Sequence, residues 1–182
     1  DTNIASDYDK LAHMLDLCKG EEREKIIENT IAGENITSEI TEKFNPAVEF
    51  GEKELVSMLF YLGYLTIQDS IADYPRLGIP NMVMKELYSS YFLKVLKGEL
   101  NLSFSENFPE IGAEIALEGK INKITELLHK YLENLSNRDF VKFDEKYVKL
   151  TFYCIAMGID SYNINSEIEV NRKYPDILLV PQ

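Results

Sequence analysis

The sequence predicts a mainly helical α+β protein with a few short strands arranged as hairpins. Apolar residues recur at helical spacing through most of the chain, as in Leu11, Met14, Leu15 and Cys18. Two stretches only, at 64–79 and 162–180, combine β-branched or aromatic runs with turn residues. With 182 residues, 45% of them hydrophobic, the chain is long enough for one sizeable domain or two small ones.

The N-terminal third is predicted to be helical. A helix over 7–18 begins at a cap, Ser6 or Asp7, and closes at Gly20. A second helix starts at Glu21. The next stretch, 33–46, has apolar residues every fourth position, and the pattern leaves open whether it is a helix or an extended arm.

Residues 51–97 form the clearest unit. The pattern predicts a helix closed by Gly63, a strand at 64–67, a turn at 68–75, a return strand at 76–79 and a helix from Met82 capped by Asn81. Helix, hairpin and helix is the winged-helix order. Winged helices often read DNA, but this last helix carries three lysines and no arginine, which favours packing or protein contact over base recognition.

Three further helices and a terminal hairpin complete the prediction. The helices cover 108–117, 121–135 and 145–157, with the last capped by Asp144 and ended by Gly158. Two strands follow, in 162–170 and 177–180. The second is apolar without alternation, which is typical of a strand covered on both faces.

Charge and composition narrow the classes of function. The net charge is -12, and residues 1–50 alone contribute -7, from 12 acidic and 5 basic side chains. Such a surface repels phosphate backbones, so high-affinity DNA binding by this chain alone is not expected. There is no apolar run of membrane-spanning length and no Gly-rich phosphate loop. The two histidines have no partners at ligand spacing, so zinc is not indicated.

The two cysteines, Cys18 and Cys154, are predicted to be free buried thiols, which favours a reducing, cytoplasmic compartment.

Carboxylates near the C-terminal end suggest a hard-cation site. Glu145 opens a predicted helix, Glu167 and Glu169 share one face of a strand, and Asp176 precedes the apolar strand. Mg²⁺ prefers such oxygen ligands. The alternative from spacing alone is that Glu145 pairs with Lys149 while the two strand glutamates coat a solvated face.

Two segments resemble a large bacterial family of AAA-ATPase-like proteins with a C-terminal PD-(D/E)XK nuclease-like domain. LVSMLFYLGYLT and LGIPN in 51–97 resemble the winged-helix-like lid of the ATPase-like domain. Glu145 followed by SEIEVNRKYPDILLVP resembles the start of the restriction-endonuclease-like fold. The resemblance implies a lid in 1–98, and a helical segment with an incomplete nuclease-like domain in 99–182.

The resemblance also implies roles for three residues. Glu145 and Asp176 match metal-binding positions, and Glu169 matches the glutamate before the turn, so Mg²⁺ is implied in the complete protein and not in this chain. The family's Gly/Arg-rich turn is replaced here by 171–175. Its Glu-x-Lys strand and phosphate loop do not occur in these residues. We therefore expect a linking fragment that is inactive alone, whose partners are the ATPase core, the rest of the nuclease domain and, through them, nucleic acid.

Two hypotheses stay open at this point. The first is the enzyme fragment just described. The second is a non-catalytic helical protein–protein interaction module whose terminal hairpin is structural. A third, DNA binding through the winged helix, predicts affinity that falls steeply with salt.

Overall fold

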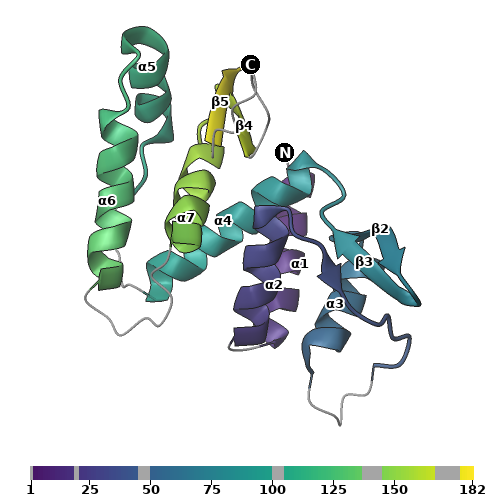
Figure 1. Cartoon of the computed structure of the whole chain (residues 1–182). Coiled ribbons are helices and arrows are strands. Elements are labelled where there is room, and N and C mark those ends of the chain that lie inside the picture. Colours follow the sequence, from purple (N-terminus) through teal and green to yellow (C-terminus); the bar gives the residue numbers. More distant parts are fainter. Residues whose placement is uncertain (1, 19–20, 45–49, 100–104, 137–144, 167–176) are drawn as a thin grey trace. The chain divides into compact units, whose positions relative to one another are not determined.

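The protein folds as two compact units of helices and small antiparallel sheets, which confirms the predicted mainly helical α+β class (Figure 1). The computed structural model describes residues 2–18, 21–44, 50–99, 105–136, 145–166 and 177–182. The units are residues 1–91 and 92–182, so the division lies within one helix, α4. The division of function between 1–98 and 99–182 stays a prediction.

The elements follow one another in nearly the predicted order. The first unit contains α1 (Thr2–Leu17), α2 (Glu21–Ala32), β1 (Ile36–Thr37), α3 (Glu52–Tyr61), β2 (Thr66–Ile71), β3 (Tyr74–Gly78) and the start of α4 (Met82–Glu99). The second contains the rest of α4, then α5 (Phe108–Glu118), α6 (Asn122–Ser136), α7 (Glu145–Met157), β4 (Tyr162–Ser166) and β5 (Ile177–Pro181).

The first unit buries the apolar faces of α1, α2, α3 and the start of α4. The fully buried side chains here include Leu11, Leu15, Ile26, Ile31, Leu55, Leu59, Leu77 and Tyr88. α1 begins before the predicted cap at Ser6 or Asp7, because no helix-breaking residue precedes that point. Asn81 caps α4 as predicted, since its side-chain oxygen accepts a hydrogen bond of 3.0 Å from the Met84 N–H.

The β2–β3 hairpin is longer than predicted. Residues 68–75, expected to be a turn, are mostly strand, and only Ala72 and Asp73 connect β2 to β3. Pro75 lies in the central strand of the order β1–β3–β2, a place that prolines rarely occupy. Its carbonyl accepts from the Ser38 N–H at 3.3 Å, so its polar side faces the point where β1 has just ended. No β2–β3 hydrogen bond therefore depends on the missing N–H.

The stretch whose form the sequence left open is an extended arm, residues 38–44. It follows β1 and lies along one face of α3. Glu39 forms an ion pair with Lys53, the Thr41 N–H donates to the Ser57 hydroxyl at 2.9 Å, and the Phe44 ring meets the Tyr61 ring edge-on at 6.4 Å. Lys53, Ser57 and Tyr61 are four residues apart on the helix and so share a face.

The second unit packs α5, α6 and α7 around a core that includes Ile111, Ile124, Leu127, Tyr131, Ile155 and Ile164. β4 and β5 form an antiparallel pair, with Ile164 opposite Leu179, and β4 lies against α7. Only Ile177, Leu178 and Leu179 of β5 are half-buried, and Val180 is 38% exposed, so the expectation of a strand covered on both faces is not met within the described residues.

Gly158 directly follows α7, as predicted. Its φ is not positive, so it is not a left-handed cap. Instead, a Cβ at this position would lie 2.5 Å from the Phe108 ring of α5. The glycine is required because the ring packs directly on the backbone. Gly63, by contrast, follows α3 with φ +80°, as a C-terminal cap should.

No helix in the part of the chain that the structure describes is long and apolar enough to cross a bilayer. Both cysteines are buried thiols, as predicted.

Candidate functional site

Glu145 is the one predicted site residue that lies within the described residues. It occupies the first turn of α7, where a carboxylate interacts favourably with the positive end of the helix dipole. Its side chain is exposed, whereas Ile155, near the other end of the same helix, is fully buried. An exposed carboxylate has two oxygens that water or a cation can reach, so its chemistry fits a hard metal ion.

The other two predicted site residues, Glu169 and Asp176, lie outside the described residues. Their distances to Glu145 are therefore not defined, and the three-carboxylate site stays a prediction. Asp176 directly precedes β5 in the sequence. Among the residues that the structure does describe, no group of three or more His, Cys, Asp or Glu side chains is arranged to hold a metal ion.

A polar cluster that the sequence did not indicate lies in the second unit. Glu106 precedes α5, and its carboxylate accepts hydrogen bonds from the Lys97 ammonium of α4 at 2.9 Å and from the Tyr131 hydroxyl of α6. The Glu106 side chain is 14% exposed and Tyr131 is fully buried. The cluster joins α4, the segment before α5, and α6, which are separate in the chain. A local sequence pattern cannot predict such a contact.

The protonation states in this cluster are set by burial and by the partners. Burial opposes ionisation of Glu106, but the donors Tyr131 and Lys97 outweigh it and lower the pKa of the carboxyl group. Burial, together with the bond to Glu106, raises the pKa of Tyr131. Glu106 thus stays ionised and Tyr131 neutral around pH 7. Neither is poised to exchange a proton there, which favours a structural role over acid–base catalysis.

The first unit has tyrosine hydroxyls in contrasting surroundings. The Tyr91 hydroxyl donates to Asp16 at 2.6 Å, and the Tyr64 hydroxyl donates to the Asp7 carbonyl at 2.9 Å. The Tyr88 hydroxyl is buried and makes no hydrogen bond within the described residues. Burial raises the pKa of Tyr88, with a smaller contribution from Tyr64, so its phenol is not a nucleophile at neutral pH.

Basic side chains of the helix–hairpin–helix segment are engaged within the chain. Lys97 binds Glu106, and Arg76 of β3 forms an ion pair of 3.1 Å with Asp69 of β2. Phosphate contacts need cations that can neutralise the backbone charge. The pairs give no support to base or phosphate recognition by this segment.

Comparisons with protein-family models, with curated proteins and with solved structures find no match for this chain.

Proposed function

We infer that the chain supplies the lid of an AAA-ATPase-like domain in 1–98 and the opening helix and strands of a PD-(D/E)XK nuclease-like domain in 99–182. The order of elements supports this proposal most directly. α3, the β2–β3 hairpin and α4 have the helix–hairpin–helix order of a winged helix. Further along, α7 begins at Glu145 and is followed by the antiparallel strands β4 and β5.

In the complete protein, Glu145 and Asp176 would hold Mg²⁺, with Glu169 beside them. The ion would polarise a phosphoryl oxygen and supply a nucleophilic hydroxide near neutral pH. The exposure of Glu145 suits this role, because a buried carboxylate without a partner would be costly. We expect the 182 residues by themselves to hydrolyse neither ATP nor nucleic acid.

The test is a nuclease assay of the complete gene product with Mg²⁺ on single- and double-stranded DNA and on RNA. Asp176→Ala and Glu145→Ala should abolish cleavage, whereas Glu126→Ala, which removes an exposed carboxylate of α6, should leave it unchanged. Cleavage that survives Asp176→Ala would contradict the nuclease assignment. Cleavage by the 182-residue chain alone would contradict its inactivity.

The second candidate is a non-catalytic helical interaction module. Leu117, in the last turn of α5, and Ile121, just before α6, are 85% and 54% exposed and support this alternative. The two candidates differ in one measurement, since only the first predicts metal-dependent cleavage that Asp176→Ala removes.

A third possibility, DNA binding through the helix–hairpin–helix segment, has its own test. It requires binding of a DNA duplex at about 50 mM salt that weakens steeply by about 200 mM. A duplex that does not bind at the lower salt concentration would exclude it.

A further inference from the structure

α5 exposes an apolar face on the solvent side of the second unit. Ile111 and Gly112 of this helix are buried. Phe108 and Ile115, on the same side, are half-buried. The opposite side is exposed, and its apolar members are Pro109, Ala113, Ala116 and Leu117. A surface helix normally has polar residues on the side that faces solvent. α5 is therefore apolar on both sides, and its outer face is open to a further contact.

Leu117 dominates this outer face. At 85% it is the most exposed large apolar side chain in the part of the chain that the structure describes. Ala113 lies one helical turn before it, so a large side chain projects beside a small one. Ile121, two residues after the Gly119 cap, is 54% exposed and enlarges the apolar area. Contiguous exposed apolar residues of this kind mark a contact surface, whereas a single one does not.

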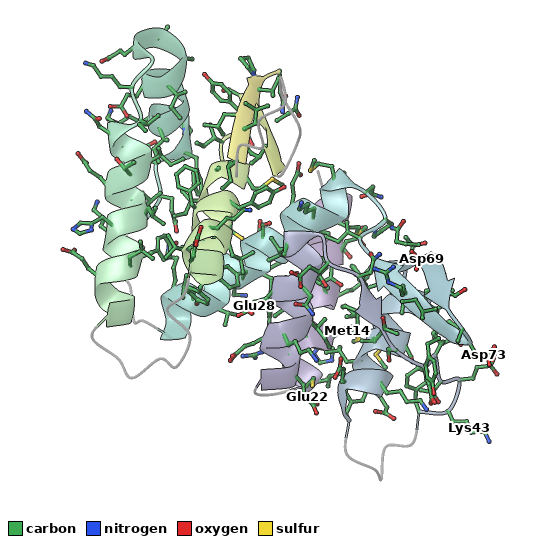
Figure 2. All side chains as sticks on the ribbon, viewed as in Figure 1. Met14, Glu22, Glu28, Lys43, Asp69 and Asp73 are labelled. Atoms are coloured by element: carbon green, nitrogen blue, oxygen red, sulfur yellow. The ribbon has the colours of Figure 1, made fainter. Side chains whose placement is uncertain are left out.

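The chain near α5 is almost electrically balanced, unlike the N-terminal end. Residues 107–130 contain four acidic and three basic side chains, and residues 1–50 contain 12 and 5. In Figure 2, Asp69 and Asp73 project from the hairpin of the first unit and add to its acidic surface. Two copies of an acidic protein repel each other where that charge is concentrated. Contact between copies is therefore opposed less at α5 than at the first unit.

The cations beside the outer face of α5 do not favour a phosphate ligand. Lys120 forms an ion pair of 2.8 Å with Glu118, and Lys123 forms one with Glu110. Nucleic-acid binding needs cations that can neutralise phosphate charge. An apolar face whose neighbouring charges are paired within the chain fits a protein surface instead.

The order of residues along the outer face is complementary to itself. Four residues follow one another at intervals of three or four positions, which places them along one line: Glu110, Ala113, Leu117 and Lys120. Lys120 lies just past the helix, and its ion pair with Glu118 holds it at that end. The line therefore runs from an acidic residue through a small and a large apolar residue to a basic one. Set against its own reverse, it brings acid to base and large to small.

We propose that α5 is a self-association surface, on which two copies of this chain pair their α5 helices antiparallel about a two-fold axis. Leu117 of each copy then packs on Ala113 of the other, and Glu110 of each lies beside Lys120 of the other. A parallel pair would instead set Glu110 against Glu110 and Leu117 against Leu117. The proposal is independent of the nuclease-like assignment, because it uses no residue of that candidate site.

One helix from each copy makes a small interface. Standard protein–protein interfaces bury about 1,200–2,000 Å². Two helices of 11 residues bury less, so we expect a weak dimer with a Kd of about 0.1 mM. Sedimentation equilibrium of the 182-residue chain, from about 10 μM to about 1 mM, measures the association. The weight-average mass should rise from 21.0 kDa toward twice that value and not beyond it.

Two substitutions remove the apolar contact by different means. Leu117→Ser should weaken dimerisation at least about tenfold, since each copy loses a buried leucine. Ala113→Glu keeps Leu117 but places a charge where it packs, and should leave the chain monomeric. Leu62→Ser, the matched control, removes a leucine that is 53% exposed in the first unit and should leave the Kd unchanged. Because all three positions are exposed, each variant should keep the circular dichroism spectrum of the wild type.

Charge reversal tests the antiparallel register. Glu110→Lys and Lys120→Glu should each weaken dimerisation about threefold to tenfold, because each sets like charges together at both ends of the pair. The double variant Glu110→Lys/Lys120→Glu should restore most of the affinity, since opposite charges again meet between the copies. Within one copy, the double variant does not restore the ion pair of residue 110 with Lys123. Recovery therefore reports the contact between copies.

Four results would overturn the proposal. One is a mass that stays at 21.0 kDa up to a chain concentration of about 1 mM, which would mean that a different partner covers this face. Another is dimerisation that Leu117→Ser and Ala113→Glu leave unchanged, which would place the contact elsewhere. The third is a double charge variant that dimerises no more tightly than the single ones, which would exclude the antiparallel register. The last is a mass that rises beyond that of a dimer, which would exclude a closed two-fold contact.

Discussion

The two units differ in how completely their buried polar groups are hydrogen-bonded. In the second unit, Glu106 receives hydrogen bonds from both Lys97 and Tyr131, so its polar cluster joins three segments. In the first unit, the Tyr88 hydroxyl is buried with no hydrogen bond within the described residues. A satisfied buried cluster rigidifies the segments it joins, whereas an unsatisfied group costs free energy. The first unit contains buried hydroxyls of both kinds, since those of Tyr64 and Tyr91 are hydrogen-bonded and that of Tyr88 is not.

The largest loss of stability is expected at Gly158 in the second unit, where the Phe108 ring packs on the backbone. Gly158→Ala would place a Cβ 2.5 Å from the Phe108 ring, and we expect a loss of about 1–3 kcal/mol in the free energy of unfolding. Urea unfolding followed by circular dichroism measures it. Gly98→Ala is the control, because no atom lies within 4 Å of its added Cβ and alanine favours the helix. Equal stability of both variants would contradict the close contact.

The polar cluster is tested by removing one partner at a time. Tyr131→Phe deletes the hydroxyl that donates to Glu106, and Glu106→Gln deletes the charge; each should destabilise by about 1–3 kcal/mol at pH 7. Since the pKa of Glu106 is lowered on folding, its contribution is full above the unfolded pKa of about 4.5 and is lost as the pH falls through the lower folded value.

The pH dependence distinguishes this cluster from an ordinary surface pair. Unfolding free energies of the wild type and Glu106→Gln, measured from pH 7 to pH 3, should converge as the pH falls. A constant difference over that range would show that the charge of Glu106 is not what stabilises the second unit.

A substitution in the β2–β3 hairpin should raise the stability of the first unit. Ala72 has φ +52°, a conformation that costs an L-residue about 1–2 kcal/mol and that glycine adopts freely. Ala72→Gly should therefore raise the unfolding free energy by up to about 1 kcal/mol, and Ala72→Val should lower it. The urea midpoint reports both. A lower stability of the glycine variant would mean that the turn has another conformation.

The smallest effect is expected at the unpartnered hydroxyl. Tyr88→Phe removes a group that makes no hydrogen bond within the described residues, so the stability should be unchanged or raised within about 1 kcal/mol. Tyr64→Phe, which removes the bond to the Asp7 carbonyl, should cost about 1 kcal/mol and is the matched comparison. If Tyr88→Phe proved as costly as Tyr131→Phe, the contrast between the two units would not hold.

Local patterns predicted the positions of most helices because periodicity and capping are properties of neighbouring residues. The helix at 145–157, the cap at Asn81 and the left-handed Gly63 are of this kind. The hairpin was predicted too short because Pro75 has no backbone N–H and proline is unfavourable where a strand needs that donor. In the structure the Pro75 nitrogen faces a position where β1 offers no acceptor, so no hydrogen bond is lost. Only the pairing of β3 with β1 shows this.

The functional and structural residues likewise fall into those that the sequence indicates and those that only the tertiary structure reveals. Residue type and position along the chain made Glu145, Glu169 and Asp176 candidates for binding Mg²⁺, the family resemblance supplied their roles, and this assignment stays a prediction. The sequence by itself determined the helical class and the acidic character of residues 1–50. Only the tertiary structure shows that Glu106 lies between Lys97 and Tyr131. It also shows that the Phe108 ring packs on the backbone of Gly158, and that the arm brings the Phe44 ring against Tyr61. Each of these joins residues far apart in the chain, and periodicity describes only neighbours.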